Sequence, residues 1–145
     1  MSKCIVSIKR LSKDAVLPKY QTEEASGMDL VSVEDHCIYR QSLAMVRTGI
    51  SISIPCGYEG QIRSRSGIAV MHNIVVLHGI GTIDSDYRGE IVVPLFNHGC
   101  KTVDILAGTR IAQLVISPVI KACVMDVEDL PKILRGCGGF GSTGK

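Results

Sequence analysis

The most restrictive feature of the sequence is an alternation of apolar and polar residues with a period of two. Ile50, Ile52 and Ile54 alternate with serines, which places every second side chain on one face of a β-sheet. No window keeps the three-and-four apolar spacing of a helix, although a short helix is expected near residues 67–72. Many short strands broken by turns predict an all-β sandwich or barrel. Besides the isoleucine segment, β-branched runs predict strands at 74–77, 90–96, 111–116 and 119–125.

Length and charge limit what the chain can bind. With 145 residues and 46% hydrophobic content, one domain can bury a core large enough to fold unaided. The net charge of +2 is spread along the chain without a run that could neutralise many phosphates, so no stable nucleic-acid partner is expected. The N-terminus has too few consecutive apolar residues for a signal or a membrane span. We therefore expect a cytoplasmic protein with no membrane partner.

The six cysteines form neither CxxC pairs nor the dense spacing of a disulfide scaffold. We expect them to be free and mostly buried thiols. The four histidines follow no metal-ligand spacing, so a structural zinc site is not expected.

The C-terminus differs in composition from the rest of the chain. Residues 135–145 hold five glycines in eleven residues, and such a segment loses much backbone entropy when it becomes ordered. A frayed end is the simplest interpretation. The arginine, the aromatic ring and the two hydroxyl groups among the glycines instead suit an arm that closes over a ligand.

Two loops carry residue types suited to phosphate chemistry. Residues 63–67, Arg-Ser-Arg-Ser-Gly, offer guanidinium forks, hydroxyls and a glycine that lets backbone N–H groups approach an anion. Such strings are also common in surface turns. Residues 81–89 place Asp84 and Asp86 on either side of Ser85 between flanking glycines. This segment could hold a carboxylate against a water molecule, or it could be an ordinary solvated turn.

Five segments, taken in order, resemble the motifs of the homotrimeric dUTP pyrophosphatase (dUTPase) family. Each match is modest alone, but five in the right order and at the right intervals are hard to obtain by chance. The chain lacks the GxSxG, HExxH and GxxxxGK[ST] signatures of other hydrolases and phosphoryl-transfer enzymes. The matching segments are 25–30, 65–67, 81–89, 108–114 and 135–144.

The resemblance implies an all-β fold, a jelly-roll-like barrel that assembles as a homotrimer with each active site built from three subunits. The β-barrel domain would comprise residues 1–134, and a flexible Gly-rich arm, 135–145, would close over a neighbouring subunit's active site. The implied reaction is Mg²⁺-dependent hydrolysis of dUTP to dUMP and pyrophosphate. That reaction limits uracil incorporation into DNA and supplies dUMP for dTTP synthesis.

The resemblance also implies roles for single residues. Asp84 would orient and deprotonate the water that attacks the α-phosphorus. Tyr87 would stack under the deoxyribose and exclude a 2′-hydroxyl, and Phe140 would lie over the uracil ring. Ser66 would lie near the bridging oxygen where leaving-group charge develops. The implied substrate-binding residues are Arg65, Ser66, Gly67, His78, Thr82, Asp84, Tyr87, Gln113, Arg135, Phe140, Gly141, Ser142 and Thr143.

In this family Mg²⁺ is carried mainly by triphosphate oxygens and waters, in keeping with its preference for few protein ligands. We therefore assign no protein ligand to the metal. Asp29 is similar to the family's buried motif-one aspartate, a supporting residue that would act through Arg110 or the solvated metal. A purely structural ion pair explains Asp29 equally well.

Three positions depart from the family pattern. Ser64 stands where many members have proline, and a looser turn is expected there. His78 stands where many bacterial members have an asparagine that reads uracil, so the side-chain source of uracil selectivity is open. Cys137 replaces a commoner polar residue, which predicts an arm sensitive to oxidation.

Two other functions fit part of the pattern. A dCTP deaminase shares the barrel and the triphosphate contacts but needs an additional acid/base group at the base. A trimeric barrel that only binds dUTP would need no positioned base, so Asp84, Tyr87 and Arg135 argue against it.

Overall fold

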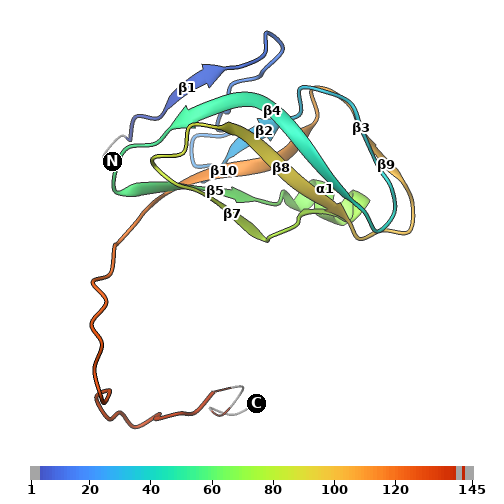
Figure 1. Cartoon of the computed structure of the whole chain (residues 1–145). Helices are drawn as coiled ribbons and strands as arrows, with labels where there is room; N and C mark the ends of the chain where they lie inside the picture. The colour runs from blue at the N-terminus through green and yellow to red at the C-terminus, as the bar shows by residue number, and fades with distance from the viewer. Residues whose placement is uncertain (1–3, 140–141, 143–145) are drawn as a thin grey trace.

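The computed structural model describes residues 4–139 and 142. Two four-stranded sheets and a two-stranded ribbon form the body, and all strand pairs are antiparallel (Figure 1). The first sheet has the order β1 (Ser7–Arg10), β4 (Leu43–Ser53), β8 (Glu90–Asn97) and β6 (Ile74–Val76). The second has the order β2 (Met28–Val31), β10 (Arg110–Pro118), β5 (Tyr58–Arg63) and β7 (Ile80–Ile83). The ribbon pairs β3 (His36–Ile38) with β9 (Val103–Ile105).

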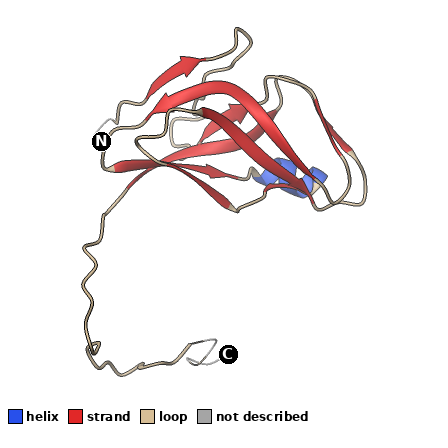
Figure 2. Cartoon of the chain, viewed as in Figure 1, coloured by secondary structure: helices blue, strands red, loops and turns tan. Residues whose placement is uncertain are grey.

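This arrangement confirms the expected all-β, jelly-roll-like fold. A short helix, α1 (Ser66–His72), follows β5 and packs at one end of the body, as Figure 2 shows in blue. It lies where a short helix was expected. Asn73 ends α1 in the left-handed conformation with φ +56°, which asparagine tolerates better than most residues. Among the described residues, no helix is long and apolar enough to cross a membrane.

The core lies between the two sheets. Ile50 is fully buried, and Ile52 and Ile54 are 2% and 3% exposed, so the alternation correctly identified the inward face of β4. Ile62 and Leu114 from the second sheet belong to the same core cluster. Each such side chain contributes about 1.5–3 kcal/mol to folding through burial.

The predicted strands at 74–77, 90–96 and 111–116 correspond to β6, β8 and β10. The strand predicted at 119–125 is wrong, because β10 ends at Pro118 and residues 120–130 are exposed and without regular structure. Figure 1 shows this segment leaving the body as an extended tail. β-branched composition favours a strand only where another strand supplies hydrogen-bond partners, and in the described part of the chain this segment pairs with no strand, although the Val119 N–H donates to the Gly57 carbonyl at 2.9 Å.

All six cysteines are free thiols. Cys4 is half-buried and the other five are exposed, so the expectation that most are buried is wrong for the single chain. They lie at turns, on the β3–β9 ribbon and in the tail, where no core covers them. The pKa of the Cys37 thiol is raised, chiefly because of its hydrogen bond with Asp104.

Candidate active site

A buried carboxylate holds two guanidinium groups at one end of the second sheet. Oδ1 of Asp29, on β2, lies 2.9 Å from Nε of Arg65, and Oδ2 lies 3.1 Å from Nη1 of Arg110 on β10. The Asp29 side chain is 10% exposed, whereas those of Arg65 and Arg110 are 25% and 50% exposed. Nη1 of Arg65 also donates to the Arg110 carbonyl at 2.9 Å. The buried carboxylate neutralises one of the two positive charges, and the partly exposed guanidinium groups leave a net positive charge toward solvent. An anion-binding site requires such a charge.

Strand pairing explains why these residues meet. β10 lies between β2 and β5, and its Gln113 stands opposite both Asp29 and Arg63. The Gln113 amide donates to the Ser64 carbonyl at 3.0 Å, which ties β10 to the turn before α1. A Cβ on Gly27 would collide with the Gln113 side chain. Gly27 therefore makes room for the Gln113 amide, a role that its place beside Asp29 in the first motif could have suggested.

Ser64 holds the turn between β5 and α1. Its Oγ accepts a hydrogen bond from the Val76 backbone N–H at 2.8 Å, and its carbonyl accepts the Gln113 amide. The Ser64 hydroxyl thus supplies a link to β6 that proline could not make, and the looser turn expected in place of proline stays a prediction.

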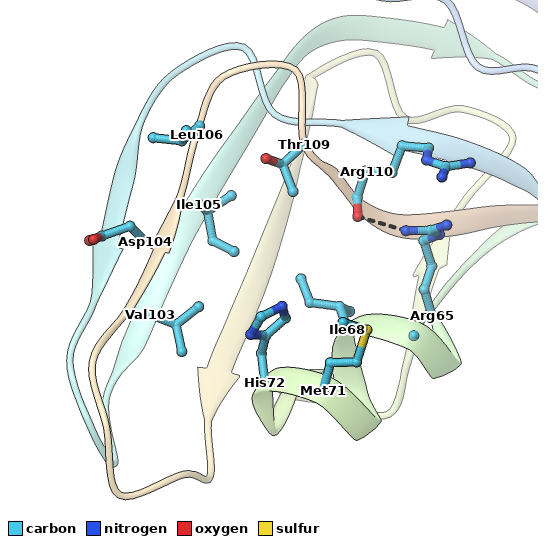
Figure 3. A pocket seen from close by; sticks show the side chains of 11 residues that line it. Arg65, Ile68, Met71, His72, Val103, Asp104, Ile105, Leu106, Thr109 and Arg110 are labelled. Carbon is cyan, nitrogen blue, oxygen red and sulfur yellow. Dashed lines mark hydrogen bonds between the residues drawn. The ribbon is translucent and has the colours of Figure 1, made fainter.

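A cavity of about 490 Å³ adjoins the guanidinium groups. Figure 3 shows α1 on one side of it, with Ile68, Met71 and His72, and Arg65 and Arg110 at one end. The opposite side is formed by β9 and the residue after it, Leu106. Gly67 also lines the cavity, and the neighbouring Ser66 is exposed. Of the expected residues, Arg65 contacts Asp29 and Gln113 stands opposite it, while Ser66 and Gly67 follow Arg65 at the start of α1.

The second group of expected residues lies on β7 and the loop that follows it. Asp84 is exposed and lines a cavity of about 360 Å³ with Tyr58, Glu59 and Lys121. The exposed Thr82 lies on β7, two residues before Asp84. In the described residues, the Asp84 carboxylate has no ion pair within 4.0 Å and accepts no hydrogen bond. Its lone pairs are therefore available to a water molecule.

Two glycines let aromatic rings lie flat against this loop. A Cβ on Gly89 would collide with the Tyr87 hydroxyl, and a Cβ on Gly81 would collide with the His78 ring. The Tyr87 hydroxyl donates to the Glu90 carbonyl at 3.0 Å. The rings of Tyr87 and His78 thus pack against glycine backbone that is half-buried at Gly89 and buried at Gly81.

One chain does not bring the two groups together. In the β5–β7 pairing, Arg63 faces Ile80 and Gly60 faces Ile83, so Arg65 lies beyond the end of β5 and Asp84 lies near its start. These pairs are three positions apart along β5, which corresponds to roughly 10 Å. The guanidinium cluster and the exposed carboxylate therefore form two half-sites on one chain.

The expected arm residues lie at the end of the tail. Arg135 is exposed, and its Nε donates to the Gly138 carbonyl at 2.9 Å. The Ser142 N–H donates to the Gly139 carbonyl at 3.0 Å. Phe140, Gly141 and Thr143 lie outside the described residues. The contacts expected between these residues and a nucleotide stay predictions.

Comparison with known proteins places nearly the whole chain in one family. Residues 13–144 match the family model named dUTPase. The deoxyuridine 5'-triphosphate nucleotidohydrolase of Nautilia profundicola is 51% identical over 140 residues, covering 97% of this chain and 99% of the relative. That of Clostridium tetani is 47% identical over 145 residues, covering 100% of both.

Solved structures of dUTPases have the same fold as this chain. A variant of the Staphylococcus bacteriophage 80alpha dUTPase with dUpNHpp superposes with a TM-score of 0.91 at 28% identity, covering 97% of this chain and 99% of that chain. A variant dUTPase from phage phi11 of S. aureus, whose structure reveals the coordination of a structural Mg(II) ion, gives a TM-score of 0.83 at 25% identity, covering 88% and 99%. The chain belongs to the dUTPase family.

Proposed function

We propose that this protein hydrolyses dUTP to dUMP and pyrophosphate, with Asp84 as the general base. Asp84 takes a proton from water, the resulting hydroxide attacks the α-phosphorus, and the bond from that phosphorus to its bridging oxygen breaks as pyrophosphate leaves. Proton transfer of this kind accelerates a reaction by about 10²–10⁴. The family match and the names of the relatives support this reaction.

The observation that carries the assignment is the contrast between two carboxylates. Asp29 is buried and has each oxygen already paired with a guanidinium group. Asp84 is exposed at the edge of a cavity and has no such partner among the described residues. A general base must reach water with a free lone pair, which favours Asp84 for catalysis and Asp29 for support.

The remaining residues divide into phosphate and nucleoside contacts. We assign Arg65, Ser66 and Gln113 to the triphosphate, because guanidinium, hydroxyl and amide donors suit its oxygens, and a Cβ on Gly67 would meet nothing within 4 Å, which leaves the backbone there accessible. We assign Tyr87 to the sugar as the barrier to a 2′-hydroxyl, and His78 and Thr82 to the uracil side. The arm would add Arg135, Ser142 and Thr143 at the γ-phosphate, with Phe140 and Gly141 over the base.

Magnesium fits this site as a partner of the substrate. No group of three or more His, Cys, Asp or Glu side chains that could hold a metal occurs within residues 4–139 and 142. Mg²⁺ commonly binds through substrate phosphates and waters with one or two carboxylates, so a nucleotide-borne Mg²⁺ agrees with these side chains. When bound, the ion neutralises negative charge on the phosphate oxygens.

A homotrimer would join the half-sites. Leu43 and Met45 are 47% and 54% exposed on the outer face of the first sheet, opposite Phe96 and Pro94 of β8. Val75 of β6 faces Phe96 from the other side. A contiguous apolar sheet face on the surface is characteristic of an interface. We propose that further copies of the chain cover this face. In such an assembly, Asp84 of one subunit would face Arg65 of another.

Exposed apolar side chains in the tail also favour contact between subunits. Ile120 and Val124 are 95% and 91% exposed, and Leu134, just before the arm, is 107% exposed. Apolar side chains this exposed are costly unless another surface covers them. We propose that the tail crosses to a neighbouring subunit and delivers the arm to its site. The cytoplasmic location expected from the sequence stays a prediction.

One assay tests the function. Pyrophosphate release is measured from dUTP, dCTP, dTTP and UTP, with and without Mg²⁺. We expect release from dUTP alone at high rate, and only with Mg²⁺. Deamination of dCTP at a comparable rate would instead favour a deaminase, and tight binding of dUTP without turnover would favour a binding protein.

A further inference from the structure

Glu90 connects the loop of Asp84 to the opposite sheet in a way that neither catalysis nor substrate contact explains. It is the first residue of β8, and its side chain is 17% exposed. Nε of Arg47 donates to both carboxylate oxygens, at 3.2 and 3.0 Å, and the Gly49 backbone N–H donates to Oε1 at 2.8 Å. One carboxylate thus satisfies a cation and a main-chain donor on β4.

These contacts lie at an irregularity in the pairing of β4 with β8. Arg47 stands opposite Val92 and Ser51 opposite Glu90, so β4 contains extra residues at this point, as in a β-bulge. Gly49 has φ +67°, and a Cβ there would lie 2.7 Å from a Val33 methyl carbon, so glycine is required. The Gly49 N–H lies within this irregularity, and the Glu90 carboxylate accepts its hydrogen bond.

The main chain of Glu90 in turn fixes Tyr87. The Tyr87 hydroxyl donates to the Glu90 carbonyl at 3.0 Å, and the ring lies against Gly89. The side chain of residue 90 is therefore held by β4 while its carbonyl holds the ring. Displacing residue 90 would move the acceptor on which the position of Tyr87 depends.

We propose that Glu90 is a positioning residue for sugar selectivity, and that it acts by anchoring the carbonyl that holds Tyr87. The inference rests on the proposed function of Tyr87 as the barrier to a 2′-hydroxyl. A barrier of this kind discriminates only if the ring cannot move aside. A side chain 42% exposed to solvent, as Tyr87 is, owes its fixed position to its hydroxyl bond and to Gly89.

The test measures kcat/KM for dUTP and for UTP in Glu90→Gln, with Thr48→Val as the matched control. Glutamine keeps the size of the side chain but cannot accept from both Arg47 and Gly49 without presenting an amide donor to one of them. We expect the dUTP/UTP ratio to fall by about tenfold, mainly through a gain in UTP turnover. Thr48→Val removes the buried hydrogen bond to the Ile91 carbonyl at the same irregularity and should lower stability while leaving the ratio unchanged.

A double-variant cycle tests whether Glu90 affects the dUTP/UTP ratio through the Tyr87 hydroxyl. In Tyr87→Phe the bond to the Glu90 carbonyl is already absent, so adding Glu90→Gln should lower the ratio no further. Additive effects, or an unchanged ratio in Glu90→Gln, would overturn the inference. If Glu90→Gln does not fold, Arg47→Met, which keeps the Gly49 bond, should shift the ratio in the same direction by less, and no shift would count against the proposal. Wild-type protein that fails to hydrolyse dUTP would refute the proposed function instead.

Discussion

Oδ1 of Asp29 lies 2.9 Å from Nε of Arg65, and this ion pair ties β2, an edge strand of the second sheet, to the start of α1. Because Arg110 is paired with the other oxygen, one buried negative charge organises two cations that lie at one end of the cavity in Figure 3. Without that charge the two guanidinium groups would repel each other at a site that must hold both near an anion.

Asp29→Asn should therefore destabilise the protein. Breaking a fully buried pair costs about 3–5 kcal/mol, but the arginines are 25% and 50% exposed, so solvent screening reduces the expected loss to about 1–3 kcal/mol. Urea unfolding followed by fluorescence or circular dichroism gives the free energy of unfolding. Asp86→Asn, in an exposed turn, is the control. An Asp29→Asn variant as stable as that control would show that the ion pairs carry little energy.

Asp84→Asn should abolish turnover while leaving nucleotide binding intact. The amide cannot accept a proton from water, so kcat should fall by a factor of about 100 or more. Turnover is followed as pyrophosphate release, and binding is measured by calorimetry with a non-hydrolysable dUTP analogue. Asp86→Asn again serves as the control, because it removes a carboxylate two residues away. Near-normal turnover in Asp84→Asn would end the assignment of the base.

The part of the fold that the sequence predicted is the part governed by local periodicity. β4 was found because Ile50 and Ile52 point to the same buried face. β5 was missed because its pattern is broken by Gly60 and by polar residues. A Cβ on Gly60 would lie 2.9 Å from Cδ1 of Ile54, so glycine is needed for close packing there. That requirement depends on tertiary contacts, which a local pattern does not contain.

For the candidate site, too, the sequence predicted what depends on local motifs and missed what depends on tertiary contacts. Motif resemblance named Asp29, Arg65 and Gln113, whose residue types show what they could bind. It could not show that Asp29 is shared by two arginines, because that contact depends on β10 pairing with both β2 and β5. Nor could it show the contact between Glu90 and Gly49, which exists only because β4 and β8 are out of regular register.

Tyr87→Ala should admit UTP. Removing the ring opens space beside Gly89, where the 2′-hydroxyl of a ribonucleotide would otherwise meet the aromatic face. We expect the dUTP/UTP ratio of kcat/KM to fall by roughly 10–100-fold, since steric discrimination in a pocket is worth about 1–3 kcal/mol. Competition assays with both nucleotides measure the ratio directly. An unchanged ratio would remove Tyr87 from sugar selection.

Cys37 should alkylate slowly despite its exposure. Its thiol hydrogen bond with Asp104 raises the pKa, so less reactive thiolate is present at pH 8 than for an ordinary thiol. Replacing Asp104 by asparagine lowers the pKa and should speed the reaction with iodoacetamide, most clearly between pH 7.5 and 9. Peptide mass spectrometry gives the rate at each cysteine, with Cys56 in the same chain as the internal standard. Equal Cys37 rates with and without the Asp104 carboxylate would contradict the proposed contact.

Truncation after Leu134 should separate assembly from catalysis. The apolar faces proposed to join the subunits, Leu43 and Met45 on the body and Ile120 and Val124 in the tail, all precede the cut, so sedimentation should give the same oligomer as for the full chain. Turnover of dUTP should fall by roughly 10²–10³, the loss expected when a charged donor to the transition state is removed. Arg135→Ala in the full chain removes that guanidinium while leaving the glycines, and should show a smaller loss in the same direction. If the truncated chain kept full activity, the arm would have no part in the reaction. If it dissociated instead, residues 135–145 would belong to the subunit interface.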